Sequence, residues 1–232
     1  MNLIPQQARD RVGTLLDPLA LLLIRWRVRP NLITTVGTLV VVGSAAAFAL
    51  GEVRWGGWLL LVAGLFDMVD GRVARQGGTT TTFGAFYDST LDRVGEALLF
   101  GGIALHFLQG GVPAARVTPA VAATLVALAA SLLVSYTRAR AEGLGLSVKV
   151  GIAQRAERVL LVGVPTAAFG GGNDGALLFW IVVVLAFATS VTVVERVVYV
   201  ARVAGDTPLR RPARPRDTVP GRAPALPIAK GP

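Results

Sequence analysis

The sequence predicts an all-α, polytopic membrane protein with six transmembrane helices and an amphipathic juxtamembrane helix at its N-terminal end. Of the 232 residues, 53% are hydrophobic and only 16% are charged, whereas soluble domains carry about 25% charged residues. The mean hydropathy is +0.60, and long apolar runs recur along the chain. This composition excludes a disordered chain, and the lack of cysteine excludes a small secreted domain held together by disulfides.

Residues 1–31 are predicted to form a cytoplasmic helix beside the membrane. Between Ala8 and Trp26, leucines are interspersed with arginines and two aspartates, a composition typical of a helix lying in the membrane interface. A frayed leader is the simpler alternative.

Six apolar segments follow within residues 32–205, and each approaches the roughly 20 residues that a helix needs to cross a bilayer. Their approximate limits are Leu32–Leu50, Gly56–Arg75, Phe83–Leu108, Ala114–Thr137, Arg158–Phe169 with flanking sequence, and Gly175–Tyr199. The fifth segment is short, so its helix is expected to begin near Ile152. Because backbone groups in lipid must be hydrogen-bonded within the protein, and no strand-like alternation occurs, these segments are interpreted as helices.

Basic residues indicate the orientation of the predicted helices. They precede the first span, lie between the second and third, crowd the connection between the fourth and fifth, and follow the sixth, whereas the opposite connections hold only Arg54 and Arg116. The positive-inside rule therefore places both termini in the cytoplasm. Residues 206–232 are predicted to be a disordered, basic, proline-rich cytoplasmic tail. The net charge of +9 thus reflects membrane topology, and no nucleic-acid partner is expected.

Four aspartates lie at the cytoplasmic ends of two neighbouring spans. Asp67 and Asp70 are three residues apart in the second span, and Asp88 and Asp92 are four residues apart in the third. Either spacing places both side chains on one face of a helix. The short connection at residues 76–82 makes the two helices antiparallel neighbours. We therefore expect the four carboxylates to converge.

Converging carboxylates repel one another and require a cation. A ligand set made only of oxygen favours Mg²⁺ or Mn²⁺ over zinc, and two such ions form the usual clamp for phosphoryl displacement. Gly71 leaves space for an anionic substrate to approach the backbone. Arg75 can oppose a phosphate charge there, and Thr81 offers a hydroxyl at the mouth of the site.

Two other interpretations of the aspartates remain open. They can form a structural ion-pair network with Arg72, Arg75 and Arg93, or they can line the pathway of a cation transporter. All four lie at one end of two helices, and no acidic residue continues the line through the other spans. The sequence therefore favours a binding site over a pathway.

These residues form an ordered pattern. It reads Asp67-x-x-Asp70-Gly71-x-x-Ala74-Arg75, then eight residues, then Gly84-x-x-x-Asp88-x-x-x-Asp92. The pattern resembles the signature of the CDP-alcohol phosphatidyltransferases, membrane enzymes that move a substituted phosphate from a CDP-linked donor to an alcohol and release CMP. The resemblance implies that the four aspartates are metal ligands, that Asp92 is the general base, and that the protein is a homodimer.

A second segment resembles the part of this family that contacts the donor. The run Pro30-Asn31-Leu32-Ile33-Thr34 is similar to the loop that begins the first span and contacts the cytidine diphosphate. From the residues themselves, Asn31 is a suitable helix N-cap, and the N–H groups that follow can bind an anion. The predicted CDP-lipid-binding residues are Asn31, Leu32, Ile33, Thr34, Gly71, Arg75 and Thr81.

Three further segments, at residues 88–93, 135–142 and 154–158, are similar to the bacterial phosphatidylinositol-phosphate synthases of this family. The resemblance implies transfer from CDP-diacylglycerol to an inositol phosphate, whose phosphate would be held by Arg138, Arg155 and Arg196. Gln154 and Ala156 depart from that pattern, so glycerol 3-phosphate, inositol or another polar alcohol is the alternative acceptor. From the residues alone, the same basic cluster is equally well explained as a topology signal.

Overall fold

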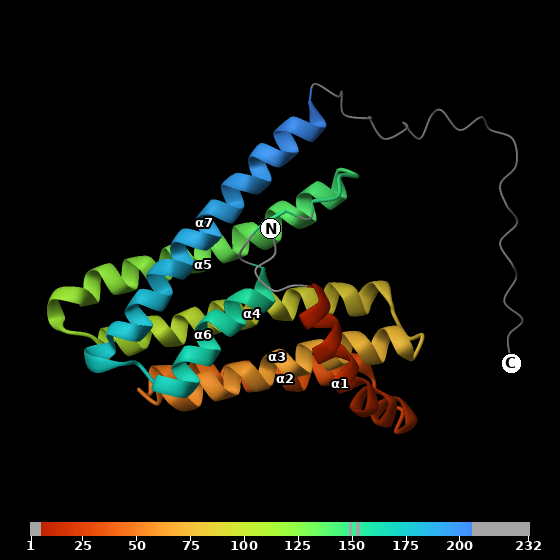
Figure 1. Ribbon diagram of the computed structural model, residues 1–232, viewed down its shortest axis with the longest axis horizontal. Helices are drawn as coiled ribbons and strands as arrows, with labels where there is room; N and C mark the ends of the chain where they lie inside the picture. The colour runs from red at the N-terminus through yellow and green to blue at the C-terminus, as the bar shows by residue number, and fades with distance from the viewer. Residues whose placement is uncertain (1–5, 149, 152–153, 206–232) are drawn as a thin grey trace, which may run out of the picture.

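The computed structural model describes residues 6–148, 150–151 and 154–205, and within these ranges it contains helices and no strands (Figure 1). The all-α prediction is therefore confirmed. The helices are α1 Gln6–Arg25, α2 Pro30–Ala49, α3 Val53–Gln76, α4 Thr82–His106, α5 Ala114–Gly143, α6 Arg155–Phe169 and α7 Ala176–Ala204, with short turns η1 Phe107–Gly111 and η2 Asn173–Gly175. The predicted tail at 206–232 lies outside the described residues.

Helices α2 to α7 correspond in order to the six predicted apolar segments. Three stretches are long and apolar enough by themselves to cross a membrane: Pro30–Ala49, Ala114–Gly143 and Asn173–Ala204. The remaining helices carry the charged residues of the site, which lowers their hydropathy. A count of six spans therefore stays a prediction.

Helix α6 begins later than the sequence analysis expects. Ile152 lies outside the described residues, and the helix starts at Arg155, where Gln154 and Glu157 form a capping box. The Gln154 backbone N–H donates to Glu157 Oε2 at 2.7 Å, which satisfies a backbone group that would otherwise lack a partner at the helix start. Fifteen residues rise about 22 Å, less than the roughly 30 Å of a bilayer core.

The helices pack as two groups, one made of α2, α3, α4 and α6 and the other of α5 and α7, and α4 contacts α5 where the groups meet. Helix α2 packs against α3 and α4, α6 packs against α3, and α5 pairs with α7. In Figure 1, α5 and α7 lie side by side and lean away from α2 and α3 toward the end where α1 crosses the bundle. We call this the site end, because it carries Asp70 and Arg75.

Two glycines allow the closest helix contacts. A Cβ at Gly102 of α4 would lie 2.2 Å from the carbonyl oxygen of Ala45, and one at Gly57 of α3 would lie 2.5 Å from the backbone nitrogen of Ala167. Small residues at such points let helix backbones approach closely in membrane proteins. They therefore set the spacing of α4 against α2 and of α3 against α6, the helices that carry the site.

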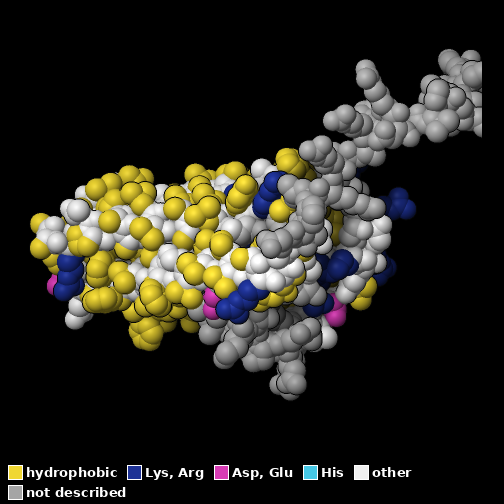
Figure 2. All heavy atoms as spheres, turned by 90° about the horizontal axis from the view of Figure 1, so that it is seen from above, with side chains coloured by type: hydrophobic (Ala, Val, Ile, Leu, Met, Phe, Trp, Pro, Cys, Tyr) yellow, Lys and Arg dark blue, Asp and Glu magenta, His cyan; other side chains and the backbone are white. Residues whose placement is uncertain are grey.

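Helix α1 is fastened to α3. Ala20 is fully buried in a small core with Val69 and Val73, and Asp17 pairs with Arg72. Another side of α1 exposes Leu15, Leu19 and Leu22. Figure 2 shows a broad hydrophobic area on one face of the bundle, with most of the coloured arginine side chains toward the site end.

Candidate active site

The site is built where α3 and α4 face each other at the site end. One carboxylate oxygen from each of Asp67, Asp70 and Asp88 lies within 4.8 Å of the others. The Asp88 Oδ1 atom is buried and has no hydrogen-bond partner. Since a buried carboxylate oxygen is costly when unpaired, and carboxylates are the ligands that Mg²⁺ and Mn²⁺ prefer, these residues fit a divalent cation.

The fourth aspartate has a different partner. Asp92 lines a cavity of about 20 Å³ together with Asp67 and Asp70, but its carboxylate is paired with Arg155 of α6. The same guanidinium lies 2.8 Å from Asp67 Oδ1. The role of Asp92 as a metal ligand and base stays a prediction.

The start of α2 supports the aspartates from the other side. Thr34 Oγ1 donates to Asp70 Oδ2 at 2.8 Å, and both residues are buried, with exposed fractions of 9% and 7%. Thr35 and Tyr87 share a hydrogen bond of 2.9 Å that ties α2 to α4. The sequence analysis missed both contacts, because they join residues 36 and 52 positions apart.

The predicted capping role of Asn31 is wrong. Helix α2 begins two residues earlier than predicted, at Pro30, and Arg29 is its N-cap without a side-chain hydrogen bond. Proline favours this first position because its fixed φ suits the helix and its missing N–H needs no partner. The Asn31 side chain instead faces α4, where its oxygen would lie 3.3 Å from a Cβ at Gly84. It still borders the connection between α3 and α4.

The other residues predicted to bind the CDP-lipid donor differ in their exposure and contacts. A Cβ at Gly71 would lie 3.1 Å from the Arg75 guanidinium, so the glycine leaves space for this side chain along α3. Thr81 is the N-cap of α4 and accepts the Gly84 N–H at 2.9 Å, which leaves its O–H free to donate. Leu32 is exposed, and Ile33 is buried beside Val69 and Val73 of the small core.

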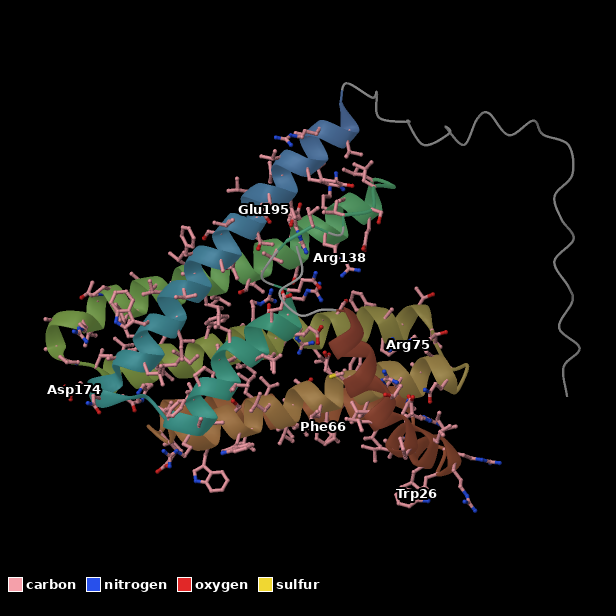
Figure 3. All side chains as sticks on the ribbon, viewed as in Figure 1. Trp26, Phe66, Arg75, Arg138, Asp174 and Glu195 are labelled. Carbon is pink, nitrogen blue, oxygen red and sulfur yellow. The ribbon has the colours of Figure 1, made fainter. Side chains whose placement is uncertain are left out.

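The three predicted phosphate-binding arginines lie on three helices. Arg155 reaches the aspartates, Arg138 forms an exposed pair with Glu142 at 2.9 Å, and Arg196 is only 4% exposed. Arg196 donates to the backbone carbonyls of Val134 and Val150. Figure 3 places Arg138 and Arg75 toward the same end of the bundle, with Asp174 at the other.

A fourth arginine joins this group. Arg138 and Arg158 lie close enough to Arg196 to repel its charge. Arg158 also pairs with Glu96 of α4. The predicted acceptor residues Arg138, Arg155 and Arg196 did not include Arg158.

Among the described residues, the aspartates form no salt bridge with Arg72 or Arg93, although Arg93 lies close enough to Asp88 to attract its charge. Arg72 pairs with Asp17 of α1, and Arg93 donates to the Ser89 carbonyl of its own helix. The arginine paired with the aspartates, Arg155, comes from α6 instead.

Comparisons with known proteins identify the family of this chain. The sequence profile of the CDP-alcohol phosphatidyltransferase family matches residues 27–192. A phosphatidylinositol phosphate synthase of Streptomyces avermitilis is 38% identical over 211 residues, which cover 86% of this chain and 83% of that protein. An archaetidylinositol phosphate synthase of Methanothermobacter thermautotrophicus is 35% identical over 199 residues, covering 84% and 92%.

Solved structures show the same fold. The crystal structure of Mycobacterium tuberculosis phosphatidylinositol phosphate synthase with CDP-DAG bound has a TM-score of 0.70 and 32% identity, covering 82% of this chain and 94% of that chain. The crystal structure of that enzyme with manganese and citrate also has a TM-score of 0.70, with 33% identity over 79% and 87% of the two chains.

The chain therefore belongs to the CDP-alcohol phosphatidyltransferase family, and it is a membrane-bound transferase of phospholipid synthesis. Within that family it is similar to enzymes that carry the name phosphatidylinositol phosphate synthase. This membership decides against the cation transporter.

Proposed function

We propose that this protein transfers the phosphatidyl group of CDP-diacylglycerol to a hydroxyl of an inositol phosphate, releasing CMP and giving phosphatidylinositol phosphate. The observation that carries the proposal is the convergence of Asp67, Asp70 and Asp88 in a chain that is 38% identical to a phosphatidylinositol phosphate synthase. Asp70 is buried and Asp88 is half-buried, and the repulsion among three carboxylates at this distance opposes folding unless a cation compensates their charge.

The cofactor in this proposal is a pair of Mg²⁺ or Mn²⁺ ions held by Asp67, Asp70, Asp88 and Asp92. When bound, the ions would neutralise the donor diphosphate and stabilise the charge that develops on the leaving CMP. The structure of a relative in complex with manganese supports the choice of a divalent ion.

The donor lies, in this proposal, across the starts of α2 and α4. Arg75 beside Gly71 opposes the diphosphate charge, and the Thr81 hydroxyl donates to it. The start of α2 from Asn31 to Thr34 orients the cytidine side of the donor. Positioned donors of this kind lower the barrier because the reacting groups need no further reorganisation.

A largely apolar cavity of about 600 Å³ adjoins this region. It is bordered by Leu60, Met68, Leu99 and Val159 and reaches Asp67 at the site. We propose that it receives an acyl chain of the donor, because an apolar chain gains free energy on burial there while the diphosphate stays at the carboxylates.

The chemical step in this proposal uses Asp92 as the base. Its carboxylate accepts the proton of the acceptor hydroxyl as that oxygen attacks the phosphorus bonded to diacylglycerol. The bond between this phosphorus and the diphosphate bridging oxygen breaks, and CMP leaves with the electron pair.

The acceptor phosphate is proposed to bind Arg138, Arg155 and Arg196. Arg138 and Arg158 repel the charge of Arg196, and Glu142 partly offsets this repulsion; a phosphate dianion would offset it further. Charge-assisted contacts with phosphate are stronger than neutral hydrogen bonds.

We further propose that both termini and the site face the cytoplasm and that the protein is a homodimer. The gathering of basic side chains toward the site end supports this orientation. The exposed Leu15, Leu19 and Leu22 of α1 support a helix resting in the membrane interface.

The test is a CMP-release assay on membranes that contain the protein and CDP-diacylglycerol. An inositol monophosphate, inositol and glycerol 3-phosphate are supplied separately, and membranes with the Asp92→Asn variant serve as the control. Release with the inositol monophosphate alone supports the proposal. Faster release with glycerol 3-phosphate or inositol would reassign the acceptor, and no release with any of the three would refute the proposal.

A further inference from the structure

Arg155 bridges the two helices that carry the aspartates. Its guanidinium is 2.8 Å from Asp67 Oδ1 of α3 and is also paired with Asp92 of α4. These two carboxylates line the small cavity at the centre of the site, and Arg155 lines it with them. An arginine thus supplies positive charge at the place where a metal ion would supply it.

A second ion pair, one helical turn farther along, connects α4 to α6. Glu96 follows Asp92 by four residues, Arg158 follows Arg155 by three, and Glu96 pairs with Arg158. The Arg158 and Glu96 side chains are only 7% and 10% exposed. Removing either partner of such a buried pair leaves an uncompensated charge and is strongly destabilising, so this pair is a fixed connection between α4 and α6.

Arg155 is less confined than Arg158. Its side chain is 28% exposed, and the Asp67 side chain is 41% exposed. Arg155 also borders the larger apolar cavity on its other side. With its backbone held by the capping box at the start of α6 and by the Glu96 pair, the long side chain has space to change rotamer without moving the helix.

We propose that Arg155 is an internal counter-ion of the metal site, which divalent ions displace and thereby release to bind the acceptor phosphate. In the metal-free protein, Arg155 neutralises Asp67 and Asp92. A divalent ion on the same carboxylates repels the guanidinium, which then turns toward the phosphate. Metal binding therefore precedes acceptor binding, and only the acceptor step rests on the function proposed above.

The proposal has a direct thermodynamic consequence. Because the arginine and the ion compete for the same carboxylates, removing the arginine must raise metal affinity. Because released arginine binds phosphate, metal and acceptor must also raise each other's affinity by the same factor. A merely structural ion pair predicts neither effect.

The first experiment measures Mn²⁺ binding to the detergent-purified full chain by electron paramagnetic resonance, without substrates. Arg155→Gln is expected to bind Mn²⁺ at least tenfold more tightly than the unmodified protein. Arg72→Gln is the matched control, because it removes the same charge near Asp70 from an arginine that pairs with Asp17. The control is expected to change the affinity by less than about threefold.

An unchanged or weaker Mn²⁺ affinity in Arg155→Gln would overturn the proposal, as would an equal gain in the Arg72→Gln control. Arg155→Lys provides a second variant if the first does not fold. A lysine ammonium is a point charge without the two-sided fork of arginine, so it competes less well at two carboxylates. Its Mn²⁺ affinity is expected to lie above that of the unmodified protein, and a lower affinity would contradict the competition.

The second experiment measures binding of an inositol monophosphate by calorimetry, with and without Mn²⁺. The unmodified protein is expected to bind it at least tenfold more tightly with the ion, and Arg155→Gln is expected to lose this dependence. If Arg155→Gln raises the Mn²⁺ affinity but no inositol monophosphate binds, the proposed acceptor is wrong. The release of Arg155 to bind that acceptor is then refuted, while the counter-ion role of Arg155 stands.

Discussion

Replacing Thr34 by valine tests whether the start of α2 positions the metal site. Valine keeps the shape of threonine and removes the hydroxyl that donates to Asp70 Oδ2 at 2.8 Å. Both residues are buried and line the small cavity of the site, so the valine removes from Asp70 a donor that the protein itself holds in place. A hydrogen bond to a charged group contributes about 1.5 to 3 kcal/mol.

If losing the hydrogen bond that orients Asp70 costs about 2 kcal/mol of metal-binding free energy, the metal affinity falls about thirtyfold, since 1.4 kcal/mol is tenfold. Partners that orient metal ligands typically contribute 10- to 100-fold to metal affinity. We therefore expect Thr34→Val to raise the Mg²⁺ concentration for half-maximal CMP release about thirtyfold. Excess Mg²⁺ should restore most of the rate, because no residue proposed to perform the chemical step has been removed.

The control is Thr38→Val, one turn farther along α2. Thr38 lines the same small cavity, but its hydroxyl donates to the Thr34 carbonyl of its own helix. It should change the Mg²⁺ dependence by less than about threefold. An unchanged Mg²⁺ dependence in Thr34→Val, or equal shifts in both variants, would refute the reasoning.

Four other expectations follow from the site and the packing. Chelation of divalent ions should abolish CMP release, because the converging aspartates need compensating charge; turnover that survives chelation would contradict the metal role. Asp92→Asn should abolish transfer while CDP-diacylglycerol still binds in a calorimetric assay, since an amide cannot accept the proton; near-normal turnover would remove Asp92 from this role. Arg155→Ala should raise the acceptor KM at least tenfold with little change in the donor KM; equal increases in both would argue for a general effect. Gly102→Ala should lower the melting temperature, because its Cβ would lie 2.2 Å from the Ala45 carbonyl oxygen and force α2 and α4 apart; an unchanged melting temperature would show that the contact relaxes without cost.

Much of this protein was predictable from local patterns in the sequence. The apolar runs predicted helices α2 to α7 within a few residues at most ends, because one helix end depends mainly on nearby residues. The spacing of Asp67 to Asp70 and of Asp88 to Asp92 predicted two faces that meet across a short connection. The structure brings together Asp67, Asp70 and Asp88.

The errors also have local causes. Asn31 is a favourable capping residue in general, but the helix begins at Pro30, two residues before the predicted start at Leu32. The start of α6 was placed too early because only the length needed to cross a bilayer was considered. The capping box at Gln154 and Glu157 begins the helix at Arg155 instead.

Only the tertiary structure decided which side chains from distant helices meet. Arg155 reaches Asp67 across 88 positions in the chain, Arg158 pairs with Glu96 across 62 positions, and Thr34 supports Asp70. A periodic pattern shows which face of a helix is apolar, but not the height or rotation at which two helices pack. Those are set by close contacts such as Gly57 against Ala167, and they determine whether a charged side chain meets a carboxylate, a carbonyl or solvent. The sequence alone therefore determined the chemistry available to this protein, and helix packing determined which partners that chemistry has.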